Sequence, residues 1–488
     1  MIIVPIVGPT LADARRQIRT SRRDADMFEF RLDLCRDPEL IRAIRSSRIP
    51  VIATCRPVRE GGRFDGGEGD RFERLGDALR AGAAYIDCEL DAVKEFRAWC
   101  SARKLRPRLI VSRHDFKDGH ADVLKVYKQL RAARADIIKF AYTATDAWQI
   151  AAARTFLQRA ARDRQRAIAI AMGEAGEASR ILYRVFGGWA TFGAAGENEG
   201  SAPGQLTAAV LRHVFLAHKR TPRTKVFGLV GDPVRQSKGI YVHNPLYAKA
   251  GFNGIYVRFP VGDLDRFMKE CGPWVSGCSV TLPHKSAMAR HCTSFIGSAA
   301  MIGAVNTVVR QGRRWIGANT DAGAALDAIE KQFPVRGERM VILGAGGAAR
   351  AIAVEGARRG AMVTIANRSE DRARGLSSEL DVAWCRTDAL AAAQPAILVN
   401  TTPVGMWPAM DAVPVPSIPP CVRLAFDAIY NPAVTRFLAM AAEQGARTVS
   451  GAAMYAGQAV DQIRILTGVR VSGATVMRTF QTAIRQHP

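Results

Sequence analysis

The sequence lacks the features that mark membrane proteins, disulfide-rich proteins and zinc proteins. No window of about 18 consecutive apolar residues is present, which excludes a transmembrane helix. The longest charge-free stretch, residues 389–410, contains three prolines and Asn400. The nine cysteines are an odd number and no two of them have C-x-x-C spacing. We therefore expect reduced thiols in a cytoplasmic protein, and no metal site.

Runs of basic residues are also missing, although the formal net charge is +24. No stretch of five or more basic residues exists, and none is interleaved with aromatic side chains as on a stacking surface. We interpret the charge as an arginine-favouring composition on an enzyme with anionic ligands. Nucleic-acid binding is the alternative, and it predicts salt-dependent binding of DNA. The N-terminus, Met1–Val7, has no basic region or cleavage site, so we expect a buried strand there rather than a targeting signal.

Lysine is scarce: only 13 of the 69 basic residues are lysines, and the other 56 are arginines. Where a positive charge alone suffices, this chain uses arginine. A lysine inside an apolar segment therefore indicates a task that arginine cannot perform, such as forming an imine or exchanging a proton.

The length of 488 residues predicts two to four domains. In residues 1–219, short apolar runs alternate with helix-like segments. The runs are Ile2–Val7, Met27–Leu32, Pro50–Cys55, Tyr85–Leu90, Leu109–Ser112, Asp136–Tyr142, Ala167–Met172 and Trp189–Ala194. Periodicity alone leaves an open doubly wound sheet possible. The count of eight, and polar residues expected at the carboxyl ends of strands, favour a (β/α)8 barrel.

The second half has an α/β pattern of a different kind. A short polar segment with Pro222 predicts a linker at 220–225. We predict an α/β domain over 226–325, a dinucleotide-binding Rossmann domain over 326–450, and a helical segment over 451–488 that returns to the 226–325 domain.

The dinucleotide prediction rests on Gly344-x-Gly346-x-x-Ala349, which follows an apolar strand and opens an amphipathic helix. Glycines at this turn let the backbone approach a pyrophosphate, which the helix N-terminus stabilises. The next strand ends in Asn367-Arg368-Ser369, where an NAD-selective site would carry an acidic residue. Arginine there favours NADP, although a surface arginine is the alternative.

Lys139 lies in the apolar segment Ile137–Ala141, and His114 lies at the end of the preceding strand, just after the run Leu109–Ser112. Burial at a barrel mouth disfavours the charged form of a lysine, and the neutral amine can attack a carbonyl carbon. A histidine on the neighbouring strand could move protons around the imine. The alternative is a lysine that reaches solvent from a strand end. Arginines form a cationic rim suited to a carboxylate, namely Arg31, Arg56 and Arg180.

A second proton-handling pair is expected in the other half. Lys285 ends Ser279-Val-Thr-Leu-Pro-His-Lys285, and Asp321 follows Asn319-Thr. Near an NADP site, such a pair can exchange the hydroxyl proton during hydride transfer. Taken alone it would be a surface salt bridge.

These motifs resemble two known families over nearly the whole chain. Residues 1–219 resemble type I 3-dehydroquinate dehydratase in Glu29-Phe-Arg31, Thr54-Cys-Arg56, Glu60-Gly-Gly, Ser112-x-His114-Asp-Phe, Ala135-Asp-Ile-Ile-Lys139 and Ser201-Ala-Pro-Gly-Gln205. Residues 224–488 resemble shikimate dehydrogenase in Gly231-Asp-Pro-Val-x-x-Ser237-Lys, Val280-Thr-x-Pro-His-Lys285, Gly303-Ala-Val-Asn306-Thr, Asn319-Thr-Asp321, Gly344-Ala-Gly-Gly-Ala348, Asn400-Thr-Thr-Pro-x-Gly-Met406 and Gln458. The order of the two is similar to that of the fused bifunctional enzyme best known from plants.

The resemblance implies a role for each matching residue. Lys139 would form a Schiff base with the 3-keto group of 3-dehydroquinate, and His114, steered by Glu60, would be the general acid and base. The ring and carboxylate would be bound by Glu29, Arg31, Arg56, Arg180, Ser201 and Gln205. In the reduction of 3-dehydroshikimate to shikimate, Lys285 and Asp321 would handle the proton, while Ser237, Thr281, Asn306, Tyr430 and Gln458 position the ring. NADP(H) would be held by Gly344, Ala345, Gly346, Gly347, Ala348, Asn367, Arg368, Ser369, Arg372, Met406, Ala428 and Gly451.

The sequence departs from these families at two positions. Pro5 stands where such dehydratases commonly have serine, so one substrate hydrogen bond is either lost or supplied by another residue. Gly239 stands where the dehydrogenase motif usually reads Ser-x-Ser, and the missing carboxylate contact is worth about 1.5–3 kcal/mol. Its loss would weaken shikimate binding or make room for quinate, so a quinate/shikimate dehydrogenase fused to its dehydratase is an alternative. A metabolite-binding regulator without activity is another, although it would be expected to lose Lys139, His114, Lys285 or Asp321.

Overall fold

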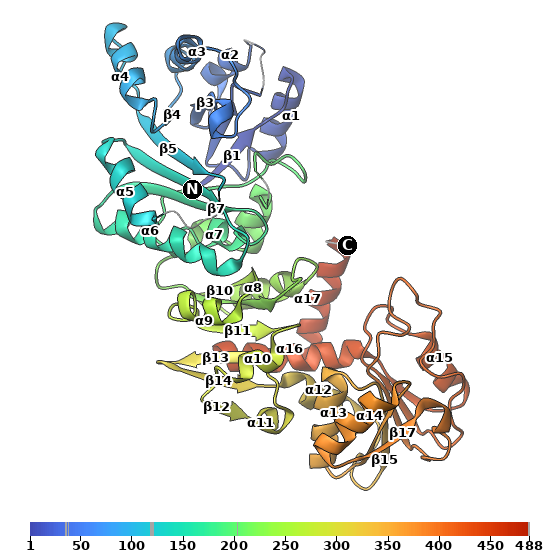
Figure 1. Cartoon of the computed structure of the whole chain (residues 1–488). Coiled ribbons are helices and arrows are strands. Elements are labelled where there is room, and N and C mark those ends of the chain that lie inside the picture. The colour runs from blue at the N-terminus through green and yellow to red at the C-terminus, as the bar shows by residue number, and fades with distance from the viewer. Residues whose placement is uncertain (35–36, 38, 118–121, 203, 487–488) are drawn as a thin grey trace. The chain divides into compact units, whose positions relative to one another are not determined.

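The computed structural model describes residues 1–34, 37, 39–117, 122–202 and 204–486 (Figure 1). The chain forms two compact units. The first unit comprises residues 1–240 and 253–274, and the second unit comprises residues 241–252 and 275–488. Among the described residues, no helix has both the length and the apolar character needed to cross a membrane.

The first unit opens with eight parallel strands that form a barrel. Its elements are β1 (Ile2–Ile6), α1 (Leu11–Ser21), β2 (Met27–Arg31), α2 (Glu39–Ser46), β3 (Val51–Thr54), α3 (Glu68–Arg80), β4 (Tyr85–Glu89), α4 (Val93–Ala102), β5 (Leu109–Asp115), α5 (Val123–Ala132), β6 (Ile137–Thr143), α6 (Ile150–Arg162), β7 (Arg166–Met172), α7 (Glu177–Ile181) and β8 (Thr191–Phe192). The strand order is β7-β6-β5-β4-β3-β2-β1-β8. Trp189 N donates to Ala167 O at 2.8 Å, which joins the segment before β8 to β7. The predicted (β/α)8 barrel is thereby confirmed.

Two strands differ from their expected runs by more than two residues in length. β5 extends to Asp115, so His114 lies inside a strand rather than after it, and β8 has only two residues. Lys139 is the third of seven residues in β6, and not at a strand end as the sequence suggested. The barrel interior is filled by apolar side chains from every strand, among them Ile3, Ile52, Ile110, Ile137 and Ile168. Because both faces of these strands are buried, they read as continuous apolar runs.

The first unit also contains a strand pair from beyond residue 220. β9 (Lys225–Gly231) and β10 (Gly254–Pro260) pair in parallel, and α9 (Leu264–Glu270) follows. The side chain of Asp146 accepts hydrogen bonds from Gly262 N and Asp263 N at 3.0 and 2.8 Å. The Arg266 guanidinium lies 3.6 Å from the centre of the Trp148 ring. These contacts pack the start of α9 and the turn before it against the loop that follows β6. The domain boundaries given above remain predictions.

The second unit contains a small sheet and a Rossmann sheet (Figure 1). Its elements after α8 (Gly239–Lys249) are β11 (Gly277–Val280), α10 (Lys285–Ala289), β12 (Ser294–Ile296), α11 (Ala299–Ile302), β13 (Thr307–Gln311), β14 (Arg314–Ala318), α12 (Thr320–Glu330), β15 (Arg339–Leu343), α13 (Gly347–Arg358), β16 (Met362–Asn367), α14 (Glu370–Leu380), β17 (Ala383–Arg386), β18 (Ile397–Asn400), β19 (Leu424–Asp427), α15 (Arg436–Glu443), β20 (Arg447–Val449), α16 (Gly451–Thr467) and α17 (Gly473–Gln486). The Rossmann sheet is parallel, in the order β17-β16-β15-β18-β19-β20, which is the doubly wound arrangement that binds dinucleotides.

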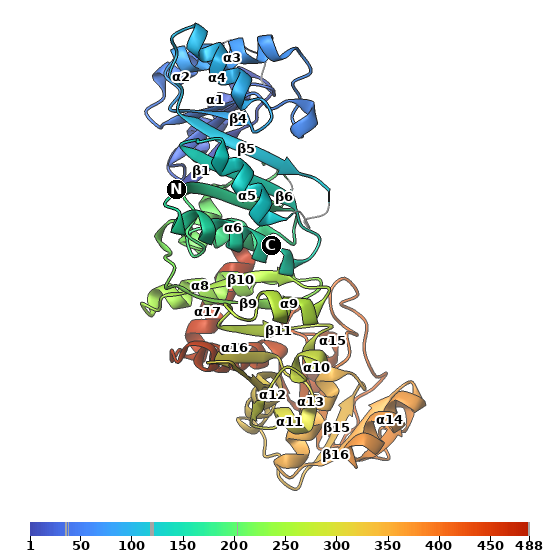
Figure 2. The same ribbon diagram turned by 60° about the vertical axis from the view of Figure 1, so that its left-hand side comes forward.

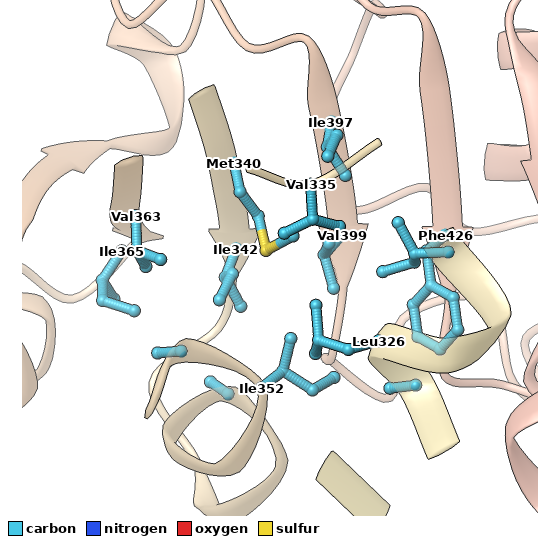
Figure 3. Packing of buried hydrophobic residues seen from close by; sticks show 14 of the residues in the cluster. Leu326, Val335, Met340, Ile342, Ile352, Val363, Ile365, Ile397, Val399 and Phe426 are labelled. Carbon is cyan, nitrogen blue, oxygen red and sulfur yellow. The ribbon is translucent and has the colours of Figure 1, made fainter. Parts of the chain in front are cut away.

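Apolar side chains from both the sheet and the helices form the Rossmann core. Figure 3 shows Ile342, Val399 and Phe426 of the sheet facing Ile352 of α13 and Leu326 of α12. α12 therefore belongs to this core and also packs against α16, a contact that can be followed in Figure 2. The return of the helical segment after residue 450 to the 226–325 domain stays a prediction. Its last two residues, 487–488, lie outside the described part of the chain.

Candidate active sites

Lys139 lies at the floor of a cavity of about 190 Å³ in the barrel. Its side chain is 6% exposed, which overturns the alternative of a lysine reaching solvent. Nζ lies 3.0 Å from Asp87 Oδ2 and 3.7 Å from Glu29 Oε1, and 4.6 Å from the centre of the Phe192 ring. A proton must leave Nζ before it attacks a carbonyl carbon, and these two carboxylates are the acceptors in contact with it.

Most of the residues expected in the dehydratase site line this one cavity. They are Glu29, Arg31, Arg56, Glu60, His114, Lys139, Arg180 and Ser201. The parallel register explains why β5 and β6 bring their side chains together, since Ser112 pairs with Lys139 and His114 with Ala141. Gln205 does not line it. Its Oε1 accepts from Ser201 N at 2.8 Å, and Gln205 faces an adjacent cavity of about 740 Å³. Pro203 of the same motif lies outside the described residues.

His114 and Glu60 form a hydrogen-bonded pair beside Lys139. His114 Nδ1 and the His114 backbone nitrogen each lie 2.8 Å from Glu60 Oε2. Burial raises the pKa of Glu60 to about 7. Burial also holds the pKa of His114 well below its usual value, and the charges of Arg56 and Lys139 add to this effect. With Nδ1–H directed at the carboxylate, Nε2 of a neutral His114 is free to accept a proton.

A steric constraint explains why the second residue of the Glu60-Gly-Gly motif, Gly61, is a glycine. This residue has φ +77°, and a Cβ there would lie 2.4 Å from the Phe116 ring. The Phe116 ring is stacked against His114, with a 6.2 Å centroid separation. Gly61 therefore leaves room for the aromatic side chain that backs the histidine.

An ionic network beneath the cavity was not found from the sequence. Arg56 contacts Asp87 and Glu89 at 2.8 and 2.6 Å and donates to Ser112 Oγ at 2.7 Å, while the other side of Glu89 is bound by Arg71. Burial acts to raise the pKa of Asp87, but Arg56 and Lys139 hold it well below its usual value. The available signal was a pair of carboxylates within the buried strand Tyr85–Glu89.

The expected cationic rim contains only one unpaired guanidinium. Arg31 is bound twice by Asp33, at 2.9 and 2.7 Å, and Arg56 is neutralised by the network. Arg180 is 2% exposed, and no hydrogen bond or ion pair joins it to another described residue. Burial lowers its pKa to about 10, against the opposing charge of Glu177. A buried cation that lines a cavity without a partner is suited to a ligand carboxylate.

In the second unit, Lys285 Nζ lies 2.7 Å from Asp321 Oδ2. Lys285 begins α10, and Asp321 lies in the first turn of α12, which Asn319 caps through its side chain. The lysine is 32% and the aspartate 19% exposed, so this pair is more open than Lys139.

Asn306 is fixed beside α12 by buried hydrogen bonds. Its Oδ1 accepts from Thr320 N and Thr307 Oγ1, both at 2.9 Å, and its Nδ2 donates to Thr320 Oγ1 at 3.0 Å. Gln462 was missed from the sequence: its Nε2 donates to Asn306 O at 3.3 Å, and its Oε1 accepts from Ser279 Oγ at 3.0 Å. The signal was a second glutamine one helical turn after Gln458.

The other predicted substrate contacts are spread over both units. Gln458 lies partly buried on α16, and Thr281 follows β11. Tyr430 is 48% exposed and its ring lies 5.7 Å from that of Tyr455. Ser237 belongs to the first unit, where its Oγ accepts from Gly239 N at 3.2 Å.

The turn between β15 and α13 fits a dinucleotide. Gly344 has φ +110°, and a Cβ there would lie 2.7 Å from Thr401 Oγ1, whereas Gly346 and Gly347 face open space at the start of the helix. Ala345 lies in the same turn, and Ala348 lies in the first turn of α13.

The adjoining surfaces also fit NADP(H). At the end of β16, Arg368, Ser369 and Arg372 are exposed and Asn367 Nδ2 donates to Ser369 O, with no carboxylate before Glu370. Met406 is half-exposed. Gly451 packs so closely that a Cβ would meet Ala428 O at 2.3 Å. These residues can hold a 2′-phosphorylated dinucleotide.

Eight cysteines are free thiols in the described part of the chain, and Cys35 lies outside it. Within that same part, no cluster of three or more histidine, cysteine or carboxylate side chains could hold a metal ion.

Comparison with known proteins agrees with this geometry. The family model of type I 3-dehydroquinase matches residues 2–221, and that of the shikimate dehydrogenase substrate binding domain matches residues 229–308. The chloroplastic bifunctional 3-dehydroquinate dehydratase/shikimate dehydrogenase of Arabidopsis thaliana is 35% identical over 497 residues, which cover 95% of this chain and 82% of that protein. The chain belongs to this bifunctional family.

The dehydrogenase half of this family member also has single-function relatives. A shikimate dehydrogenase (NADP(+)) of Caldanaerobacter subterraneus is 35% identical over 260 residues, covering 50% of this chain and 92% of the relative. A solved shikimate dehydrogenase in complex with NADP+ is 32% identical, with a TM-score of 0.50, and the match covers 55% of this chain and 98% of that one.

Proposed function

We propose that this chain dehydrates 3-dehydroquinate to 3-dehydroshikimate in the barrel and then reduces that product to shikimate with NADPH. One observation carries the proposal: a single 190 Å³ cavity contains buried Lys139, the His114–Glu60 pair and the unpaired Arg180. These are a nucleophile, an acid–base group and a carboxylate receptor, which together suit imine chemistry on a keto acid.

In the barrel, Lys139 Nζ attacks the 3-keto carbon and the oxygen leaves as water, which gives an iminium. Nε2 of His114 removes the proton beside the iminium, and the electron pair moves into an enamine. The same histidine then protonates the departing hydroxyl, which leaves as a second water. Addition of one water to the iminium releases the product and frees Lys139, so the net change is the loss of one water.

In the second unit, NADPH supplies a hydride when it is bound. Lys285 and Asp321, 2.7 Å apart, provide the proton that the carbonyl oxygen needs as it becomes a hydroxyl. Within this unit, Thr281, Asn306, Tyr430 and Gln458 are the proposed ring contacts. Asn306 is well suited to this task because its orientation is fixed by three hydrogen bonds to Thr307 and Thr320.

Quinate oxidation is a second candidate, and Gly239 favours it. A Cβ at this position would lie 3.2 Å from Ser237 Oγ and 3.4 Å from Tyr256 Cε1. The glycine therefore leaves space beside Ser237 that a serine would fill. Oxidation rates with quinate and shikimate separate the two candidates, because a chain that turns over shikimate alone has no role in quinate metabolism.

The first experiment is NADPH oxidation by the purified chain after addition of 3-dehydroquinate. We expect a lag followed by steady oxidation, because the barrel must first make the substrate of the second unit. Activity only with added 3-dehydroshikimate would refute the barrel assignment. No activity with either compound would favour a metabolite-binding regulator.

We further propose a cytoplasmic location, which is supported by the free thiols. We propose that the anionic small molecules above, rather than nucleic acid or membranes, are the ligands of this basic chain. DNA binding at low salt would contradict that assignment.

A further inference from the structure

The short helix α7 carries two charged residues one turn apart, Glu177 and Arg180. Arg180 lines the barrel cavity, whereas Glu177 lines the adjacent 740 Å³ cavity. The Glu177 side chain meets Arg258, which comes from β10 of the same unit, with 3.6 Å between Nη1 and Oε2. Arg258 lies outside residues 2–221, which are the residues that match the dehydratase family model.

Both partners of this ion pair are buried and incompletely satisfied. Their side chains are 11% and 12% exposed, and neither Glu177 Oε1 nor Arg258 Nε has a hydrogen-bond partner among the described residues. Burial raises the pKa of Glu177, while Arg258 is the strongest of the charges that oppose the rise. The other charged groups acting on it are Glu174, Arg235 and Arg180, and Arg235 is engaged with Glu174 at 3.9 Å.

The charge of Glu177 therefore acts on two guanidinium groups, those of Arg258 and Arg180, and of these two only Arg180 lines the catalytic cavity. Among the described residues, Glu177 is the carboxylate whose charge acts on Arg180. If Arg258 were absent, the buried carboxylate would need another cation, and Arg180 lies one turn away on the same helix. A carboxylate drawn to Arg180 would compete with the carboxylate of the substrate.

We propose that Arg258 is a positioning residue of the dehydratase site: it holds the Glu177 carboxylate so that Arg180 stays open to the carboxylate of the substrate. This inference rests on the proposed function of Arg180. It means that a residue from the dehydrogenase half sets the affinity of the barrel for its substrate.

The test is a double-mutant cycle in the full chain, with the kcat and KM of dehydration measured separately. We expect R258M to raise the KM for 3-dehydroquinate about tenfold, the factor for losing part of a charge-assisted hydrogen bond, with kcat changed less than about twofold. E177Q should leave KM unchanged or lower it, because the competing anion is gone. The double variant R258M/E177Q should return the KM to near its original value. R258K keeps a positive charge beside Glu177, so its KM should stay close to that of the original chain.

Arg235→Met is the matched control, because Arg235 lines the same cavity with an exposed side chain. Its KM should stay unchanged. The reduction of 3-dehydroshikimate by each variant reports whether the second half is still folded. Additive losses in the double variant, an unchanged KM in R258M, or a fall in kcat alone would overturn the inference. A chain without any dehydratase activity would instead overturn the proposed function.

Discussion

The two lysines proposed as catalytic lie in different kinds of surroundings. Lys139 projects from the middle of a barrel strand, is 6% exposed, and lies above a network of buried carboxylates and guanidinium groups. Lys285 begins a short helix, is 32% exposed, and has a single acidic partner. This difference in burial and in charged partners fits the reaction proposed for each lysine. An imine requires a desolvated amine held in one geometry, whereas proton donation during hydride transfer requires only a positioned acid beside the cofactor.

The largest effect is expected at Lys139. Lys139→Arg should lower the rate of dehydration by on the order of 10⁴-fold or more, which amounts to its loss. The reason is that a guanidinium stays protonated and forms no imine. Reduction of 3-dehydroshikimate should be unaffected. Borohydride treatment with substrate, followed by peptide mass analysis, should label Lys139 in the original chain.

Lys128→Arg is the control for this change, since Lys128 is exposed on α5. Residual dehydration by Lys139→Arg, or a label on another lysine, would show that the buried lysine is not the nucleophile.

Lys285→Met should have the converse effect. We expect NADPH-dependent reduction to fall by about 10²–10⁴-fold, the usual contribution of a general acid or base, with dehydration unchanged. Lys331→Met, an exposed change at the end of α12, is the control. If Lys285→Met instead raises only the KM, the lysine binds substrate and Asp321 must be tested as the proton donor.

The His114–Glu60 pair predicts a pH dependence for the barrel alone. The pKa of Glu60 is raised to about 7, so its carboxylate form is lost as the pH falls through that value. Since the carboxylate orients His114 and stabilises its protonated form, we expect kcat/KM for dehydration to rise up to about pH 7.

Glu60→Gln should lower kcat by about 10²-fold and remove that rise. The pH profile of the reduction should be the same in both proteins. An unchanged dehydration profile in Glu60→Gln would assign the rise to another group.

The smallest effect is expected at Gln462, which contacts Ser279 and the Asn306 carbonyl and is not itself a proposed substrate contact. Gln462→Leu leaves Ser279 Oγ and Asn306 O without this partner, at a cost of about 1–3 kcal/mol in stability. The KM for 3-dehydroshikimate should rise a few-fold, by less than about tenfold, with dehydration unaltered. Asp461→Asn, on the same helix, is the control. Thermal denaturation and steady-state kinetics measure both effects, and an unchanged KM would limit Gln462 to a structural role.

The barrel could be predicted from the sequence because buried parallel strands leave uninterrupted apolar runs. Lys139 was recognisable because lysine is rare in this chain. Asp87 and Glu89 were missed, since two carboxylates inside a strand show their purpose only when the register places them beside Arg56 and Lys139. The pairing of Glu177 with Arg258 was equally hidden, because 81 positions separate them in the chain. Such contacts depend on tertiary packing, and no local pattern encodes them.

The packing of α12 against α16 constrains how the second site can change. A Cβ added at Gly457 would lie 3.0 Å from that of Ala324, so these helices touch almost backbone to backbone. Asp321 belongs to one and Gln458 to the other. The partner of the proposed proton donor and the proposed ring contact therefore behave as parts of one rigid block. Evolution can alter the substrate by exchanging side chains on this block, but enlarging its small residues would shift both groups at once.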